Sequence, residues 1–408
     1  MPGTLRLALR NLGRQRRRTG LALSAISFGI VALLLAGGFI EWIFWGMREG
    51  AIHTRLGHIQ VVRPGYIERG GSDAFGYLLP EQATEFDMIK SVDHVQAVAP
   101  RLVFNGLISH NETTLSFIGE GVDPEHEKEI SQHLFIRAGE DLSKQKPGGV
   151  ILGTGLAASL GVQPGDSVIL LATTVAGGIN AVETRVAGVF YSSSKAFDDA
   201  ALRVSIEDAR QLLRVSGSHV WVVLLDDTSR TAGVLRELQA KFAEGVGAFE
   251  FVPWNDLADF YNKTVVLLSR QIDIVKLIIG LIIVLSISNV LIMSVLDRTA
   301  EIGTLMAVGI ARRHILRLFL GEGCLLGIIG GIVGLVVGFL LSKLISAIGI
   351  PMPPPPGVDV GITGRIMVTL PMMAGAFVLA VGTTLIASLY PAWKASRLEI
   401  VDALRHSR

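Results

Sequence analysis

Residues 297–323 read DRTAEIGTLMAVGIARRHILRLFLGEG and lie directly between two long apolar runs. The stretch carries four arginines and, before Gly321, two acidic residues, and its apolar positions have the periodicity of a short helix. A charged helical connector of this kind is unusual in so apolar a chain. The nature of the two runs that flank it therefore decides the fold.

The composition points to a membrane protein. The chain has 408 residues, of which 50% are hydrophobic and only 18% are charged, and its mean hydropathy is +0.50. These values are too apolar for an ordinary soluble protein. A net charge of +1 argues against a nucleic-acid partner, because such binders carry a large basic excess. The single cysteine, Cys324, excludes an intrachain disulfide.

Four stretches are long enough to cross a bilayer, which takes about 20 mostly apolar residues. A buried core helix is the alternative for any one of them, but four with charged flanks favour transmembrane helices. The predicted spans are 19–46, 271–296, 318–347 and 367–390. We therefore predict an α-helical membrane protein with four transmembrane helices and a large α+β extracytoplasmic domain between the first two.

The arginines predict the orientation. They cluster in the N-terminal segment 1–18, in the connector 297–317 and in the tail 391–408, whereas the Pro-rich loop 348–366 has few charges. Positive charges favour the cytoplasmic side. Both termini and the connector are thus expected inside, and residues 47–270 and the Pro-rich loop outside.

The N-terminal segment has leucines on one helical face and arginines on the other, which is typical of a helix lying on the membrane surface. A simple cluster of topogenic charges is the alternative. The first span lacks a signal-peptidase pattern, so we interpret it as an uncleaved anchor. Within 47–270, short β-rich runs alternate with helical patterns, in one or two lobes. Ser205 is a predicted helix N-cap, and the last helix of the domain, from about Asn255, should continue into the second span.

The sequence offers no catalytic, cofactor or metal site. His126, Glu129 and His133 could hold a metal, but their loose spacing is more typical of a solvated helix face. No hydrolase or metalloprotease motif occurs, and no lysine follows the pattern of a phosphate-binding loop. An anchored enzyme is therefore the least favoured function.

The third span combines glycine rows with a carboxylate. Small residues at four-residue spacing let helices approach closely in lipid, and here they form two such rows, Gly323, Gly327 and Gly331, and Gly330, Gly334 and Gly338. We predict that they pack against another span of this chain or of a second copy. Glu322, at the cytoplasmic end, is either interfacial or part of an intramembrane polar site.

The connector is predicted to be a short amphipathic helix that stops at Gly309. Ile302, Leu305 and Met306 share one face with that glycine. The opposite side is formed by Glu301, Thr304 and Val308. The helix is either a plain turn between spans or is shaped to fit a groove on a cytoplasmic partner.

The motifs together resemble the FtsX-like permeases, the membrane subunits of a class of ABC transporters. The resemblance rests on DRTAEIGTLMAVGIARRHILRLFLGEGCLLGIIGGIVGLVVG, on the ending YPAWKASRLEIVDALRH and on the start LALRNLGRQRRRTGLAL. Ile400 departs from the proline that many members have. Residues 47–270 resemble a MacB-like periplasmic core domain. The resemblance implies a bacterial inner-membrane protein with a periplasmic domain.

The resemblance also implies partners. The connector would be a coupling helix docked on a cytoplasmic ABC ATPase present in two copies, which would bind ATP and Mg, so this chain needs no cofactor of its own. A second permease copy, or a related permease, would complete the dimer. By position, the residues expected to carry the ATPase contact are Arg298, Glu301, Ile302, Gly303, Thr304, Met306, Ala307 and Gly309.

The stretch HTRLGHIQVVRPGY and the chain length look most similar to the lipoprotein-releasing permeases of the LolC/LolE kind. This implies a lipoprotein or another amphiphilic cargo taken from the inner membrane, with membrane lipids around it. One alternative is a MacB-type efflux mechanotransmitter that works with a periplasmic adaptor or acceptor. Another is an FtsX-type regulator of a periplasmic hydrolase, which the large size of 47–270 disfavours.

Overall fold

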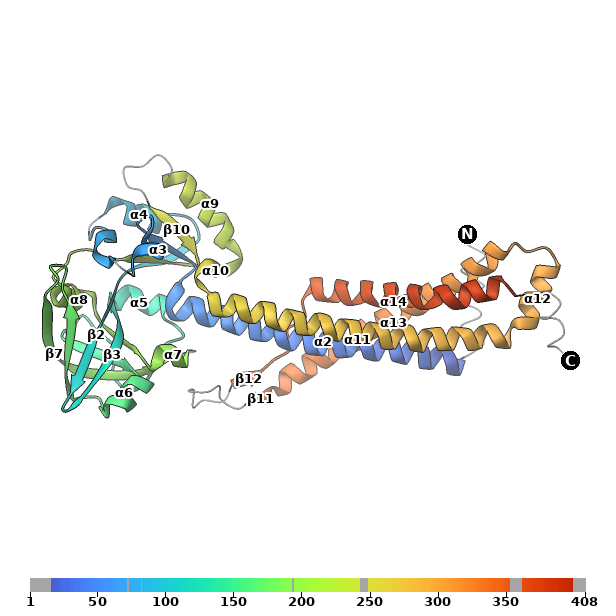
Figure 1. Ribbon diagram of the computed structural model, residues 1–408, viewed down its shortest axis with the longest axis horizontal. Helices are drawn as coiled ribbons and strands as arrows, with labels where there is room; N and C mark the ends of the chain where they lie inside the picture. Colours follow the sequence, from blue (N-terminus) through green and yellow to red (C-terminus); the bar gives the residue numbers. More distant parts are fainter. Residues whose placement is uncertain are drawn as a thin grey trace. The chain divides into compact units, whose positions relative to one another are not determined.

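The computed structural model describes residues 16–71, 73–81, 83–192, 194–242, 249–352 and 362–398. Two compact units make up the chain (Figure 1). The membrane unit comprises Met1–Phe44, Thr264–Met352 and Thr363–Arg408. The α/β unit comprises Trp45–Lys263 and Pro353–Ile362. Each unit has hydrophobic clusters of its own.

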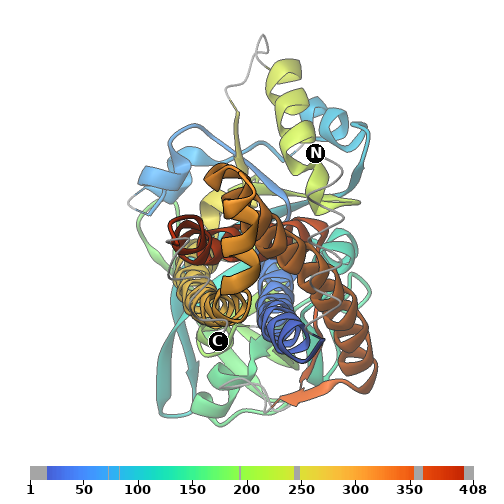
Figure 2. The ribbon, with the colours of Figure 1, turned by 90° about the vertical axis from the view of Figure 1, so that its right-hand side faces the viewer.

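In the described residues, four helices are long and apolar enough to cross a membrane. The first three extend past both ends of the predicted span, because charged or amphipathic turns continue the helix beyond its apolar part. The fourth begins at Leu370, just inside its predicted start, and continues past its predicted end. Figure 2 shows the first two of them, coloured blue and yellow-orange, nearly end-on. The four are α2 (Arg16–Ala51), α11 (Asp259–Asp297), α13 (Arg312–Ile348) and α14 (Leu370–Ser396).

The α/β unit lies between α2 and α11, whereas the segments that connect α11, α13 and α14 are short. A π-helical turn, η1 (Ile52–Leu56), follows α2 directly. Helix α12 (Thr299–Ala307) connects α11 to α13, and strands β11 (Ile350–Met352) and β12 (Ile362–Gly364) pair between α13 and α14. The four consecutive prolines of the predicted loop (353–356), most of segment 1–18 and the end of the tail lie outside the described residues.

The α/β unit contains a ten-stranded sheet in the order β10-β1-β9-β2-β3-β8-β5-β7-β4, with β6 pairing with β2 and β7. Most neighbours are antiparallel, while β3 pairs with β8 and β5 with β7 in parallel. The strands are β1 (Ile59–Val62), β2 (Val95–His110), β3 (Thr113–Val122), β4 (Phe135–Gly139), β5 (Gly149–Gly153), β6 (Ser167–Thr173), β7 (Ile179–Tyr191), β8 (Ala201–Ser205), β9 (Val220–Leu225) and β10 (Glu250–Pro253).

Short helices cover the sheet. In α8 the Ser205 hydroxyl accepts the Asp208 amide at 3.0 Å, which confirms the predicted N-cap. A break at Ala258 separates α10 from α11, so the helix that enters the second span begins at Asp259 and not near Asn255. The helices are α3 (Tyr66–Arg69), η2 (Ala74–Tyr77), α4 (Thr84–Lys90), α5 (Pro124–Ile130), α6 (Thr154–Leu160), α7 (Lys195–Asp198), α8 (Ile206–Leu213), η3 (Thr228–Arg230), α9 (Thr231–Phe242) and α10 (Trp254–Leu257).

Two lobes share this sheet. In one, α4 and α9 pack around Trp221 with residues of β1, β9 and β10. In the other, α6 and α8 pack around Leu202 with residues of β3, β5, β6 and β7. Strand β2 has 16 residues and contributes to both cores, because its first half pairs with β9 and its second half with β3 and β6.

Candidate coupling site

The connector between α11 and α13 is the helix α12, which ends as the sequence predicts. The Val308 amide donates to the Thr304 carbonyl at 3.1 Å, and the Gly309 amide donates to the Met306 carbonyl at 3.0 Å. Gly309 then takes a φ of 97°, in the left-handed region that favours glycine. The chain turns there and starts α13 three residues later.

The inner face of α12 is buried within the membrane unit. Ile302 is 4% exposed and packs, with Met306, in a cluster that includes Phe319 of α13 and Ala392 of α14. Gly303 is buried beside them. Because these three connector residues lie inside the chain, we correct the expected ATPase contact: they support the connector and do not form its outer surface.

The outer face of α12 is accessible. Val308 is 80% exposed and Leu305 is 40% exposed. Neither residue is among those expected from the sequence to contact the ATPase. For Leu305 the reason is that the helical pattern placed it with the inner residues. The remaining members of the accessible face are Glu301, Thr304, Ala307 and Gly309. Exposed aliphatic side chains beside a carboxylate form a small surface suited to a partner protein.

An ion pair joins the connector to the third span. The Arg298 guanidinium lies 3.0 Å from a carboxylate oxygen of Glu322 and 3.3 Å from one of Glu301. It also stacks over the ring of Phe319, 5.9 Å from the centroid. Glu322 is buried. Arg298 therefore links α12 to the buried carboxylate of α13 and does not extend freely from the surface.

The two glycine rows of α13 face two different helices. Residues of α14 lie next to the first row, which is Gly323, Gly327 and Gly331, and residues of α2 lie next to the second, which is Gly330, Gly334 and Gly338. A Cβ on Gly327 would fall 2.1 Å from the Thr384 hydroxyl, and one on Gly334 would fall 2.7 Å from the Ile30 Cβ. Both neighbours belong to this chain. The missing side chains allow α13 to lie directly against α2 and α14.

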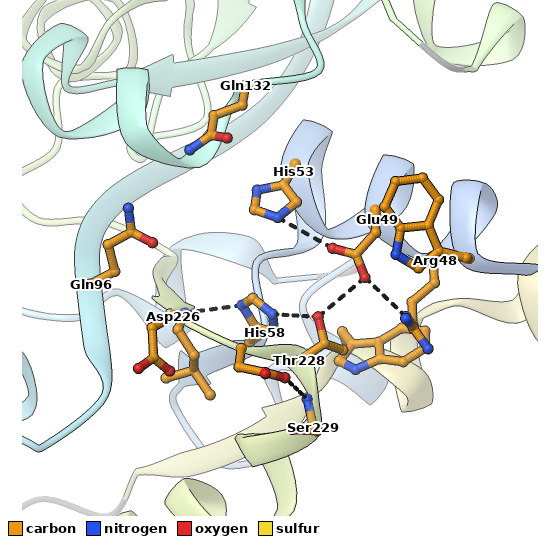
Figure 3. Close-up of a pocket in the computed structure, with 13 residues that line it drawn as sticks. Arg48, Glu49, His53, His58, Gln96, Gln132, Asp226, Thr228 and Ser229 are labelled. Carbon is orange, nitrogen blue, oxygen red and sulfur yellow. Dashed lines mark hydrogen bonds and ion pairs between the residues drawn. The ribbon is translucent and has the colours of Figure 1, made fainter. Parts of the chain in front are cut away.

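The α/β unit has a polar pocket of about 700 Å³ next to the last turns of α2 (Figure 3). Glu49 accepts from Arg48 Nε at 3.0 Å and lies 3.5 Å from His53 Nε2. The Thr228 hydroxyl, 3.3 Å from the same carboxylate, lies 3.0 Å from Nε2 of His58. Sequence patterns gave no hint of this group, because its members come from separate elements.

His58 is held in its neutral form. Its Nδ1 accepts the Leu225 amide at 3.0 Å, so a proton on that nitrogen would oppose a backbone N–H. Burial, followed by the charge of His53, lowers the pKa of His58 to about 4 from its ordinary value of 6.5. The neutral ring thus donates through Nε2 to Thr228.

The two histidines of the metal alternative have other contacts in the structure. In the part of the chain that the structure describes, no three histidine, cysteine or acidic residues gather as metal ligands would. His126 lies 3.2 Å from the helix-capping carboxylate of Asp123, and the ring of His133 packs against His53 and Phe135. Glu129 lies on α5, the same short helix as His126.

Two family models cover most of the chain. The MacB-like periplasmic core domain matches residues 19–241, and the FtsX-like permease C-terminal domain matches residues 274–400. This chain belongs to the FtsX-like permease family. It is an ABC transporter permease of the type to which MacB and LolC belong, as the sequence motifs predicted.

Individual relatives agree with this family. The chain is 30% identical over 310 residues to the lipoprotein-releasing system transmembrane protein LolC of Xylella fastidiosa, covering 70% of this chain and 72% of the relative. It is 25% identical over 430 residues to the macrolide export ATP-binding/permease protein MacB of Bdellovibrio bacteriovorus, covering 98% of this chain and 61% of the relative. A solved periplasmic region of MacB from Actinobacillus actinomycetemcomitans matches 52% of this chain and 94% of its own, at 14% identity and a TM-score of 0.36.

Proposed function

We propose that this chain is the membrane subunit through which a separate ABC ATPase, bound in two copies at the cytoplasmic face, moves the extracytoplasmic α/β unit. The observation that carries the proposal is the two-sided packing of α12. Its inner residues are anchored among α11, α13 and α14, while Val308 and Leu305 remain exposed on the outer side. A helix anchored in this way passes displacement to the spans and does not simply deform.

The ion pair of Arg298 adds rigidity to this connection. It ties the first residue before α12 to Glu322, one turn inside the third span. The tight contacts of the glycine rows then bring α2 and α14 against the same helix. A displacement of the connector would therefore move four helices together, with no channel through the bundle required.

We propose a lipoprotein or another amphiphilic molecule in the outer leaflet of the inner membrane as the cargo. The relative named for lipoprotein release supports this, since it shares 30% identity over most of both chains. Efflux through a periplasmic adaptor is the second candidate. It is supported by the macrolide-export relatives, which match 98% of this chain.

The ATPase contact is tested by Val308→Asp, which places a charge on the exposed face. The matched control is Val175→Asp, since Val175 is also exposed but lies in the α/β unit. We expect Val308→Asp to reduce recovery of the co-expressed ATPase and its permease-dependent ATP turnover at least about tenfold, as loss of one docking contact allows. Val175→Asp should retain both. Equal recovery with both variants would contradict the proposal.

The cargo is tested with the permease and its ATPase in proteoliposomes. If the cargo is a lipoprotein, ATP should release a triacylated lipoprotein to a soluble acceptor. Binding of an adaptor protein, with no release of lipoprotein, would favour the efflux alternative.

A further inference from the structure

The end of the first long helix is held by side chains of the α/β unit. A helix leaves its last carbonyl groups without partners of its own. Here the Thr54 carbonyl, in the π-helical turn η1, accepts from Arg203 at 3.1 Å and from the Ser131 hydroxyl at 3.3 Å. The Arg55 carbonyl accepts from Arg101. All of these residues belong to one compact unit.

The two arginines belong to a buried ionic cluster. Arg101, Glu120, Glu127 and Arg203 are each between 1% and 5% exposed. Arg203 Nε donates to Glu120 at 2.9 Å, and Arg101 Nε donates to Glu127 at 3.1 Å. The four come from β2, β3, α5 and β8, so the cluster joins separate elements of the sheet and its covering helix.

The charges in the cluster are well compensated. Burial alone would raise the pKa of Glu120, but Arg203, Arg101 and Arg55 outweigh it and hold the pKa at about 2. Burial likewise opposes the charged form of Arg101, and Glu127 and Glu120 raise its pKa above the ordinary value. In both groups the opposite charges of the neighbours outweigh the effect of burial and favour the charged form.

Stability alone does not explain four buried charges. Replacing a buried ionic cluster by apolar residues of similar volume is often neutral or stabilising. What apolar residues cannot supply is directional donors to the carbonyls of Thr54 and Arg55. Each guanidinium satisfies a carboxylate with one edge and a helix-end carbonyl with another, which a single aliphatic or amide side chain cannot do.

We propose that Arg101 and Arg203, positioned by Glu127 and Glu120, form a buried ionic clamp that fixes the end of α2 in the α/β unit and so serves as the force-bearing joint of the permease. The force-bearing role rests on the proposed function, whereas the rigidity of the joint does not. The clamp makes these arginines positioning residues for the movement that the ATPase drives.

The rigidity is measured by the distance distribution between two spin labels in the full-length protein in lipid nanodiscs. The labels are attached at Gly46→Cys on α2 and at Glu112→Cys in the β2–β3 turn, in a protein whose native cysteine is removed by Cys324→Ala. Gly46 is exposed and has open space around it, so it can carry a label. The wild-type clamp should give one narrow distribution. Arg203→Met should broaden it about twofold or more, because the helix end loses its donor.

Arg210→Met is the matched control. Arg210 is also partly buried, pairs with Glu81 at 2.7 Å and donates to the Gly217 carbonyl at 3.0 Å, but does not contact the end of α2. Arg210→Met should leave the width of the distance distribution unchanged. Equal broadening by Arg210→Met and Arg203→Met would overturn the proposal, because general loosening would then explain both.

Arg101→Lys tests the rigidity of the clamp if Arg203→Met does not fold. Lysine keeps the charge opposite Glu127 but cannot also donate to the Arg55 carbonyl as the forked guanidinium does. A broadened distribution with the wild-type melting temperature supports the clamp. A distance distribution as narrow as that of the wild type overturns the proposal. Because no ATPase is present, neither outcome bears on the ATPase contact.

Discussion

The close approach of α13 to α2 predicts that Gly334→Ala destabilises the protein although alanine favours helices. The new Cβ would lie 2.7 Å from the Ile30 Cβ and 3.0 Å from the Ser27 Cα. Carbon atoms normally pack at about 3.5–4.0 Å, so the two helices must separate by about 1 Å. Overpacking of this kind costs about 1–3 kcal/mol, and helix propensity returns about 1 kcal/mol. We expect a net loss of up to about 2 kcal/mol.

Gly321→Ala is the control on the same helix. Nothing lies within 4 Å of the position its Cβ would occupy, so only the propensity gain of up to about 1 kcal/mol remains. The assay is the melting temperature of the full-length protein in detergent, read from the fraction that stays monodisperse after heating. Gly334→Ala should melt below the wild type, and Gly321→Ala at or above it.

A Gly334→Ala variant that melts at or above the wild-type temperature would show that close contact with α2 does not limit the side chain at this position, and that result alone would refute the prediction. Equal destabilisation by Gly334→Ala and Gly321→Ala would refute it as well, because open space and close contact would then have the same consequence.

Three further predictions concern the connector and the polar pocket. Gly309→Ala should lower the free energy of unfolding by about 1 kcal/mol, because a φ of 97° strains any residue with a Cβ. Gly309→Asn should lower it less, since asparagine tolerates this region better. Equal melting temperatures for the two variants would oppose this prediction. Arg298→Lys should lower stability by about 1–2 kcal/mol in the same assay, because lysine cannot bridge Glu301 and Glu322 together; an unchanged melting temperature would show that the bridge is dispensable. His58, with its pKa lowered from 6.5 to about 4, contributes stability that is fully present above pH 6.5 and is lost as the pH falls towards 4, by about 1–3 kcal/mol. The pH dependence of unfolding between 4 and 6.5 should therefore flatten in His58→Gln, and an identical slope in both proteins would contradict it.

The spans were predictable because a run of about 20 apolar residues has few soluble explanations. The ends of the membrane-spanning helices were less predictable, since α11 begins at Asp259, in an amphipathic stretch well before the apolar run. The stop at Gly309 was predictable from local chemistry alone. The family likewise followed from three motifs, each of which is a continuous stretch of sequence that needs no tertiary contact to be recognised.

The faces of the connector were only partly predictable. The helical period separates two sides of α12, but which side is buried depends on Phe319 and Ala392, which are distant in sequence. The ionic cluster was missed for a similar reason. Arg101 and Arg203 each stand between apolar neighbours in a strand, and a lone arginine there is expected to be exposed unless the buried carboxylates of other elements are known.

The central claim, that the outer face of α12 docks on an ATPase, is tested most directly by a site-specific crosslink. Thr304→Cys, in a Cys324→Ala background, places a thiol on that exposed face, and Thr113→Cys places one on the exposed β2–β3 hairpin as a control. In membranes that contain the folded permease and its ATPase, we expect a crosslink to the ATPase from position 304 and none from position 113. Absence of any ATPase crosslink at 304, or an equal yield at both positions, would contradict it.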